Sequence, residues 1–404
     1  MTKAVIFLAD GMADEPIDRL GGKTPLEAVD TPAMDRIAAR GINGTFFSLP
    51  EGFPTSSDAA NMSVLGYNLA QLYPGRGPIE AVSQGIKLRD DDIAWRCNLV
   101  YVDSKDILID YSAGHIDNAI SSQLIRDLQE KFGSAEVTFY PGVSYRNLLV
   151  LHGKKFSAAV DYAKPDSSQG EHISQLRLKP QNNSPEAVGT AAFLEDLDRK
   201  SAAFLARHPL TRGVKNPGNR IWPWSPGHRP NFTPFAEKYA GKTAAVISAV
   251  DVIRGIGKCA RMDVIEVPGA TGFIDTNYEG KAQAAIKALK SHDLVYLHVE
   301  AIDECSHMGD LELKMRAIRD FDQRIVAPVM AACGDDVIYA VLPDHPVPLR
   351  LRAHTRTPVP VAICGPGIVP DGIGHYAESL AAQGTLGALK EDEFIRFVLG
   401  LWRP

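Results

Sequence analysis

The chain has 404 residues, of which 45% are hydrophobic and 23% are charged, and its formal net charge is -6. This composition is typical of a soluble globular protein with material for two or three domains. The mildly acidic balance, without long runs of one charge, argues against a nucleic-acid partner. The five cysteines are scattered without C-x-x-C pairs, so we expect reduced thiols and a cytoplasmic protein instead of a disulfide or zinc framework.

The first apolar run, Lys3 to Ala9, fits a strand that is buried on both faces of a parallel sheet. This run is too short for a signal peptide or a membrane span, and no later segment approaches about 18 uninterrupted apolar residues. We therefore expect no membrane association. Asp10 directly follows the run. A carboxylate just beyond the carboxyl end of a parallel strand lies where open α/β sheets place their active sites.

Two short helices are expected next. Pro32 predicts the start of a helix that ends before Gly41. The stretch 53–66 predicts a second helix, which begins after a Pro-Thr-Ser-Ser turn and ends at Gly66. Ser57 lies in its first turn, where backbone N–H groups and the positive end of the helix dipole favour an ionised hydroxyl. A serine at such a position either caps its helix or serves as a nucleophile that carries a phosphoryl group.

The pattern changes after residue 73. Short strand-like segments at 94–102, 107–109, 137–140 and 146–151 surround an amphipathic helix at about 118–131. A polar stretch at 161–184 follows them. This α+β pattern predicts a smaller domain at residues 82–185, which is inserted into a larger domain formed by residues 1–81 and 186–404.

The α/β alternation returns in the second half of the chain. Strands are predicted at 244–250, 264–267, 294–299, 337–342 and 359–364, and helices at 281–291, 311–333 and 391–401. Before them, residues 218–229 hold Trp222 and Trp224 among prolines and glycines, which predicts an unusual loop instead of a solvated linker. The segment 255–260 matches a dinucleotide fingerprint only partly, and we assign no nucleotide site to it.

Acidic and histidine residues follow two of these predicted strands. Asp303 and His307 follow the third strand at a spacing of four, so one helical turn would place both on one face. Asp344 and His345 follow the fourth strand, and His354 lies nine residues further on. Because the carboxyl ends of parallel strands meet at one edge of a sheet, we expect these residues to converge there with the first aspartate of the chain.

The converging side chains suit a metal site. Mixed imidazole and carboxylate ligands favour zinc, manganese or iron-type ions over calcium. Three aspartates and three histidines exceed what one tetrahedral ion takes, so two ions are expected. Two ions about 3.5–4 Å apart are a familiar device for displacement at phosphorus. The pattern therefore predicts metal-dependent phosphoryl transfer at this edge of the sheet.

These residues, with further motifs along nearly the whole chain, resemble the cofactor-independent phosphoglycerate mutases of the archaeal type, in the alkaline phosphatase superfamily. The matching motifs are Asp10-Gly11, Ser57 to Tyr67, Gly75 to Ala81, Arg96-Cys97-Asn98, Gly255-Ile256-Gly257, Gly269 to Gly272, Asp303 with His307, Asp344-His345, and His354. The resemblance implies an alkaline-phosphatase-like α/β fold, with a mainly parallel sheet between helices and an inserted smaller α+β domain. It also implies the glycolytic interconversion of 3-phosphoglycerate and 2-phosphoglycerate without 2,3-bisphosphoglycerate.

The resemblance also implies roles for single residues. Ser57 would become phosphoserine during turnover. One divalent ion would be held by Asp10, Ser57, Asp344 and His345, and the other by Asp303, His307 and His354. The ions would be manganese or zinc, with magnesium as the alternative.

The substrate would be a small phosphorylated metabolite, and the protein a monomer or a small homo-oligomer. Arg76, Arg96 and Arg146 are candidate substrate-binding residues, since guanidinium groups bind carboxylate or phosphate bidentately. His115 is a candidate for contact with the substrate or for proton transfer. The inserted domain would carry such groups.

The chain departs from the family in two places. Archaeal-type mutases carry Asp-Arg-x-Ala-Gly-Arg-Ile where residues 110–116 read Asp-Tyr-Ser-Ala-Gly-His-Ile, and residues 222–224 are aromatic where related mutases tend to carry a basic residue. The variant segment resembles a bacterial branch proposed to act as homoserine kinases in threonine biosynthesis. A mutase and a homoserine kinase-like phosphotransferase both stay open. A non-catalytic member of the fold is less favoured, because all seven inner residues are present.

Overall fold

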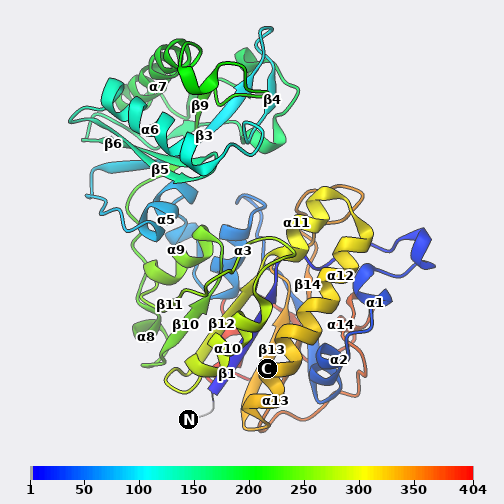
Figure 1. The fold of residues 1–404 in the computed structure, drawn as a ribbon. Helices are drawn as coiled ribbons and strands as arrows, with labels where there is room; N and C mark the ends of the chain where they lie inside the picture. The colour runs from blue at the N-terminus through cyan, green and yellow to red at the C-terminus, as the bar shows by residue number, and fades with distance from the viewer. Residues whose placement is uncertain (1–2, 404) are drawn as a thin grey trace. The chain divides into compact units, whose positions relative to one another are not determined.

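The computed structural model describes residues 3–403, which form two compact units (Figure 1). One unit comprises the residues up to Tyr73 and from Asn231 onward, and the other comprises Pro74–Pro230. Between residues 3 and 403, no helix is long and apolar enough to cross a membrane.

The second unit extends beyond the insertion predicted at 82–185. Helix α5 (Arg76–Ser83) packs on its sheet through Ala81. Helix α7 (Pro185–Leu205) contributes to its core, and strand β9 (Arg220–Gly227) pairs with its longest strand. The predicted boundaries therefore differ from those of the compact units, because these three elements find their packing partners inside the second unit.

The first unit is built on an eight-stranded sheet with the order β11-β10-β12-β1-β13-β14-β2-β15. Its strands are β1 (Lys3–Ala9), β2 (Gly41–Phe46), β10 (Ala244–Ile247), β11 (Asp263–Ile265), β12 (Leu294–Val299), β13 (Val337–Leu342), β14 (Val359–Cys364) and β15 (Gly387–Leu389). The five strands from β11 to β13 are parallel, whereas β14 runs antiparallel to both of its neighbours. The prediction of a mainly parallel sheet is confirmed. Strand β1 lies inside the sheet, and its residues 4–9 are buried, which explains their continuous apolar character.

Strands β2 and β15 were not predicted, and glycines explain why β2 escapes recognition. Gly41 and Gly44 lie within it. A Cβ atom on Gly41 would lie 2.0 Å from the carbonyl oxygen of Ile363, and one on Gly44 would lie 2.4 Å from that of Gly387. The neighbouring strands therefore approach too closely for side chains at these two positions. The two glycines and Asn43, which are uncommon in strands, hide the β-forming character of Ile42, Thr45 and Phe46.

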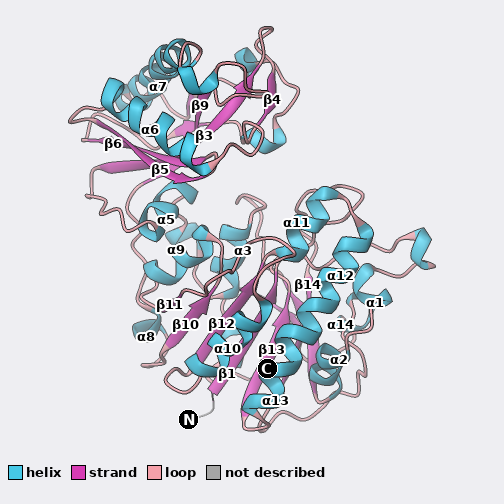
Figure 2. Cartoon of the chain, viewed as in Figure 1, coloured by secondary structure: helices cyan, strands magenta, loops and turns pink. Residues whose placement is uncertain are grey.

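Helices lie on both sides of the sheet (Figure 2). One layer packs through the main apolar core and contains α2 (Pro32–Ala39), α10 (Tyr278–Ala288), α12 (Leu311–Phe321) and α13 (Ala327–Cys333). Helix α9 (Asp251–Cys259) lies on the other face, where Gly257 meets Val246. Gly257 thus allows close helix–strand packing. The remaining helices of this unit are α1 (Pro25–Ala28), α3 (Ser57–Val64), α4 (Leu69–Leu72), α8 (Phe235–Lys238), α11 (Ala301–Met308), α14 (Glu378–Ala381) and α15 (Glu393–Val398).

The helix predicted at 311–333 is interrupted by a π-helical turn at Asp322–Val326, between α12 and α13. The turn carries a buried carboxylate to the start of α2. Asp322 accepts hydrogen bonds from the backbone N–H groups of Ala33 (3.2 Å) and Met34 (2.7 Å). Burial raises the pKa of Asp322 to about 6. Thr31 occupies the N-cap position of α2, as its sequence suggests, but makes no side-chain capping hydrogen bond, so Asp322 of the irregular turn accepts the first N–H groups of this helix instead.

The second unit contains an antiparallel sheet with helices packed on it, as the α+β pattern predicts. Its remaining strands and helix are β3 (Asp92–Val102), β4 (Leu108–Asp110), β5 (Val137–Val143), β6 (Arg146–His152), the small pair β7 (Val160–Asp161) and β8 (Lys179–Pro180), and α6 (Asn118–Phe132). Trp95 and Leu149 of the sheet pack with Leu128 of α6 and Leu194 of α7 in one apolar core.

Strand β9 corrects the prediction of a loop at 218–229. It runs antiparallel to β3, with Trp222 opposite Asn98. The indole N–H of Trp222 donates to the carbonyl oxygen of Ala163 (2.9 Å), and that of Trp224 donates to the side-chain oxygen of Asn98 (3.0 Å). Among the described strands, β9 pairs with β3 alone, so β9 is an edge strand. Prolines are tolerated in an edge strand, although they are also typical of the loop that the sequence predicted.

One buried lysine connects α12 to the loops that follow β1 and β13. The ammonium group of Lys314 donates to Oδ2 of Asp14 (2.7 Å) and to the carbonyl oxygen of Val347 (3.0 Å). Asp14 also accepts the backbone N–H of Leu349 at 3.2 Å. Lys314 and Asp14 are both buried, with side-chain exposures of 0% and 2%. This ion pair therefore holds two loops near the carboxyl edge of the sheet in place.

Replacing Lys314 by Met should lower the free energy of unfolding by about 3–5 kcal/mol, because Asp14 would stay buried without its cation. Urea unfolding followed by far-UV circular dichroism measures this change. Arg316→Met on the same helix is the matched control, since Arg316 is exposed and pairs with Asp320 at 3.5 Å. Its expected change is below about 0.5 kcal/mol. Equal effects of the two substitutions would contradict the role given to Lys314.

Candidate active site

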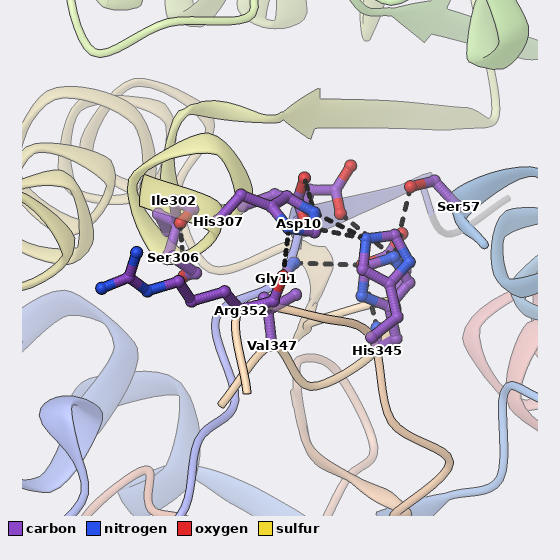
Figure 3. Close-up of polar contacts among 12 residues, drawn as sticks. Asp10, Gly11, Ser57, Ile302, Ser306, His307, His345, Val347 and Arg352 are labelled. Atoms are coloured by element: carbon purple, nitrogen blue, oxygen red, sulfur yellow. Dashed lines mark hydrogen bonds and ion pairs between the residues drawn. The ribbon is translucent and has the colours of Figure 1, made fainter. Parts of the chain in front are cut away.

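Ser57 is the first residue of helix α3, and Figure 3 shows its side chain directed toward His345. The residue before it, Ser56, occupies the N-cap position, and its side chain makes no capping hydrogen bond. The helix ends just before Gly66, whose φ is 71°, so the predicted end is confirmed. Oγ of Ser57 lies 3.2 Å from Nε2 of His345. The hydroxyl therefore points toward a histidine from another loop and does not cap its own helix.

A first cluster comprises Asp10, which follows β1, and Asp344 with His345, which follow β13. One ligand atom from each residue lies within 4.8 Å of the others. Nε2 of His345 lies 3.5 Å from Oδ1 of Asp10 and 3.4 Å from Oδ2 of Asp344. The backbone N–H groups of Gly11 and His345 donate to Oδ1 of Asp344, at 3.2 and 2.8 Å. The cluster thus joins two strand ends that are adjacent in the sheet.

A second cluster comprises Asp303 and His307 of α11 with His354. Nε2 of His307 lies 3.3 Å from Oδ2 of Asp303, and Nε2 of His354 lies 3.4 Å from Oδ1 of Asp303. The two imidazole Nε2 atoms are 2.9 Å apart. Nδ1 of His307 donates to the carbonyl oxygen of Arg352 at 2.9 Å, so in the neutral ring Nε2 carries the lone pair that can bind another partner.

Gly11 lets the two clusters approach each other. Its φ is 66°, and a Cβ atom at this position would lie 2.7 Å from Oδ1 and 2.8 Å from Cα of Asp303. Only glycine fits there without displacing helix α11. His345 joins the clusters further, because its ring stacks on that of His354 with centroids 3.8 Å apart. The structure therefore brings all seven predicted inner residues together.

Burial and like charge shape the ionisation of the two clusters. Burial raises the pKa of Asp10 well above its usual value, and the nearby charge of Asp344 raises it further. Burial also raises the pKa of Asp344, to about 7. Burial lowers the pKa of His345 well below its usual range, so its ring is neutral, as a metal ligand must be. Burial also opposes ionisation of Asp303, but the charges of His354 and His307 outweigh it and hold the pKa of Asp303 well below its usual value.

Two carboxylate oxygens lack the partner that a buried carboxylate normally has. Oδ1 of Asp10 and Oδ1 of Asp303 are buried, and neither accepts a hydrogen bond from the described residues. Each belongs to a different cluster and lies beside an imidazole nitrogen. Buried acceptors without a partner are rare and costly. A divalent cation in each cluster would satisfy its unpartnered oxygen. The donor set therefore fits a centre for two cations.

Three supporting residues near these clusters were not predicted. Asn61 donates to the carbonyl oxygen of Ser57 and to Oδ2 of Asp344, both at 2.8 Å, and accepts the hydroxyl of Tyr296. His298 lies 3.0 Å from Oδ2 of Asp10. Tyr296 and His298 interrupt the apolar run of β12 with polar groups, and that interruption is the signal by which the sequence could have revealed them.

Residues 38–211 match a family model described as 2,3-bisphosphoglycerate-independent phosphoglycerate mutase. A protein of that name from Methanosarcina acetivorans is 46% identical over 401 residues, which cover 97% of this chain and 98% of the relative. The chain belongs to the 2,3-bisphosphoglycerate-independent phosphoglycerate mutase family. A probable mutase of the same kind from Geobacter sulfurreducens is also 46% identical, over 97% of this chain and 98% of its own length.

Solved structures support the same fold. A protein from Pyrococcus horikoshii matches with a TM-score of 0.82 and 26% identity, over 100% of this chain and 98% of that chain. The cofactor-independent phosphoglycerate mutase of Thermoplasma acidophilum matches with a TM-score of 0.64 and 26% identity, over 99% of both chains. The predicted fold and family are therefore confirmed.

The four predicted substrate-binding residues lie in the second unit: Arg76, Arg96, His115 and Arg146. Arg76 and Arg96 both pair with the carboxylate of Glu80. Burial opposes ionisation of Glu80, but the charges of Arg96 and Arg76, with a smaller effect of Arg146, hold its pKa below the usual value. Burial lowers the pKa of Arg96 to about 10.

Tyr145 links the other two of these residues. Nε of Arg146 donates to the Tyr145 hydroxyl at 3.2 Å, and the ring of His115 meets that of Tyr145 edge to face, with centroids 6.2 Å apart. His115 has a φ of 53°, which is uncommon for a residue with a side chain. The four predicted residues thus gather around Glu80 and Tyr145 inside the second unit.

The metal-free protein should bind two Mn²⁺ ions and release protons as it does so. The pKa of Asp344 is raised to about 7 by burial, and that of His307 to about 9, because the charge of Asp303 outweighs the effect of burial. Each group is protonated below its pKa and must lose that proton to coordinate, so the affinity should rise with pH up to about 9. Calorimetric titration in buffers of different ionisation enthalpy measures the protons released. Proton-free binding at neutral pH would contradict this account.

Proposed function

We propose that this protein interconverts 3-phosphoglycerate and 2-phosphoglycerate, a step of glycolysis, through a phosphoserine at Ser57. The position of Ser57 carries the proposal. Its hydroxyl lies 3.2 Å from His345, at the start of a helix and beside two clusters of aspartates and histidines. Relatives that are 46% identical over 97% of this chain bear the mutase name, which supports these two substrates.

Two divalent ions complete the proposed centre. We assign one to Asp10, Ser57, Asp344 and His345 and the other to Asp303, His307 and His354. Carboxylate and imidazole donors together favour manganese or zinc, with magnesium as the alternative. When bound, such ions supply the positive charge that lowers the pKa of a serine hydroxyl and neutralises a transferring phosphoryl group. The two unpartnered oxygens of Asp10 and Asp303 support this assignment.

The chain itself positions the nucleophile. Asn61 bonds both the carbonyl oxygen of Ser57 and the carboxylate of Asp344, so it fixes the serine turn against the first cluster. Oγ of Ser57 attacks phosphorus in line, the P–O bond to the substrate breaks, and the released glycerate oxygen takes up a proton. The backbone N–H groups at the start of α3 favour the negative charge of the phosphoryl group. The group then returns to the other hydroxyl of the same glycerate, and no 2,3-bisphosphoglycerate is needed.

We assign the second unit the role of substrate binding. Arg76 and Arg146 would bind the carboxylate or phosphate of the substrate, and His115 would contact it or move a proton. Arg96 is only 2% exposed. We therefore give Arg96 the role of holding Glu80, and through it Arg76, and not that of a direct ligand.

A homoserine kinase-like phosphotransferase is the second candidate. It is suggested by His115 and Trp224, which stand where related mutases carry basic residues. The surroundings of Trp224 favour the mutase instead. Its ring lies 5.4 Å from the guanidinium carbon of Arg96 and 5.9 Å from that of Arg76, so the aromatic residue supports the cationic group and does not replace it. The convergence of all seven inner residues disfavours a non-catalytic member of the fold.

We place the protein in the cytoplasm, as a monomer or a small homo-oligomer that acts on a small phosphorylated metabolite. All five cysteines are free, which suits a reducing compartment.

The protein, loaded with Mn²⁺ and supplied with 3-phosphoglycerate alone, should form 2-phosphoglycerate. Phosphorus-31 NMR distinguishes the two esters directly. A parallel reaction with ATP and homoserine tests the second candidate. Phosphohomoserine in the second reaction, without 2-phosphoglycerate in the first, would overturn the mutase proposal.

Ser57→Ala should lower turnover by more than about 10³-fold, because it removes the group that accepts the phosphoryl. Ser56→Ala is the matched control, since the neighbouring hydroxyl makes no hydrogen bond in the described chain and should be dispensable. Mass spectrometry of the wild type after rapid quenching should locate a phosphate on Ser57. Appreciable activity of Ser57→Ala would exclude Ser57 as the nucleophile.

A further inference from the structure

His298 is a fully buried histidine in the middle strand of three that lead toward the active site. It lies in β12, between β10 and β1. Its Nδ1 is 3.2 Å from Oγ of Ser248, which follows β10, and its Nε2 is 3.0 Å from Oδ2 of Asp10, which follows β1. A chain of hydrogen bonds therefore crosses three adjacent strand ends and stops at one oxygen of an active-site carboxylate.

The direction of this chain follows from its donors. Oγ of Ser248 accepts the backbone N–H of Val250 at 3.0 Å, so its own proton is available for Nδ1 of His298. An imidazole that accepts at Nδ1 carries its proton at Nε2 and donates it to Asp10. A carboxylate oxygen accepts a hydrogen bond, so the proton of this imidazole belongs on Nε2, which faces Oδ2 of Asp10.

The two oxygens of Asp10 consequently differ. Oδ2 is held by His298, whereas Oδ1 accepts no hydrogen bond from the described residues and lies 3.5 Å from Nε2 of His345. A hydrogen bond to one oxygen restricts rotation of the carboxylate, so it favours the orientation in which the other oxygen faces the first cluster. Without that hydrogen bond, Asp10 could turn its charge away from the histidine.

We infer that His298, oriented by Ser248, is a positioning residue that directs Oδ1 of Asp10 toward a divalent cation in the first cluster. This inference rests on the proposed function, because it assumes that the cluster binds a cation. Its ligand class is a divalent transition-metal ion bound through carboxylate and imidazole. Partners of this kind typically contribute 10- to 100-fold to metal affinity.

The test measures Mn²⁺ binding to the metal-free protein by isothermal titration calorimetry. His298→Leu should weaken one of the two Mn²⁺ sites by about 10- to 100-fold. His298→Gln should restore most of this affinity, since its amide nitrogen can donate from nearly the same place as Nε2. Ser248→Ala should weaken the same site by about 2- to 10-fold, the effect of one neutral hydrogen bond.

The second unit offers a matched control. Nδ1 of His152 lies 2.7 Å from Oδ1 of Asp92, and its Nε2 lies 2.9 Å from Oγ1 of Thr138. This is a hydroxyl–histidine–aspartate arrangement with the two ring nitrogens exchanged, and it lies apart from both ligand clusters found among residues 3–403. His152→Leu should leave both Mn²⁺ dissociation constants unchanged.

The outcomes separate this inference from the proposed function. Unchanged Mn²⁺ affinities in His298→Leu, or equal losses in His298→Leu and His298→Gln, would overturn the positioning role while the mutase proposal stands. A wild-type protein that binds no Mn²⁺ would overturn the proposed metal centre itself. Thermal unfolding of the metal-free variants reports whether they fold. If His298→Leu does not fold, Ser248→Ala decides, and wild-type affinity in that variant would refute the inference.

Discussion

Negative charge buried at the carboxyl edge of the sheet is the constraint on which the rest of this structure depends. Asp10, Asp303 and Asp344 are all buried, and isolated charges in a protein interior are costly. The chain offsets only part of this cost, with N–H donors from Gly11 and His298 and with neighbouring imidazoles. Lys314, the buried cation of α12, neutralises Asp14 and not these three. The proposed divalent cations would supply the positive charge that the chain itself does not provide at this edge.

The parallel sheet meets this demand geometrically. Parallel strands end at a common edge, so residues far apart in the sequence arrive together without long loops. Contacts behind the edge then hold the loops in place: Lys314 ties α12 to the loops after β1 and β13, and Asn61 ties helix α3 to Asp344. Gly11 removes the side chain that would keep α11 away. Catalytic geometry here depends on residues that never need to touch a substrate.

Much of this arrangement was readable from the sequence, because it follows from local patterns. Continuous apolar runs predicted the central strands, and the acidic and histidine residues after them predicted the convergence that the structure shows. What escaped prediction depends on distant partners. Strand β9 looked like a loop because its prolines are acceptable only at an edge that β3 defines, and β2 was hidden by Gly41 and Gly44, whose absent side chains make room for other strands. The role of His298 could not be predicted, since its two partners lie on different strands.

The place of His345 between the clusters has a thermodynamic consequence. Its ligand atom lies within reach of Asp10 and Asp344 on one side and of Asp303 and His354 on the other. Nε2 has a single lone pair, so it can coordinate only one cation at a time. If both proposed positions are filled, their occupancies are therefore linked. Because linkage is reciprocal, stronger binding of one cation to this imidazole would weaken binding of the other by the same free energy. In the proposed centre, the two cations would therefore bind as one coupled unit and not independently.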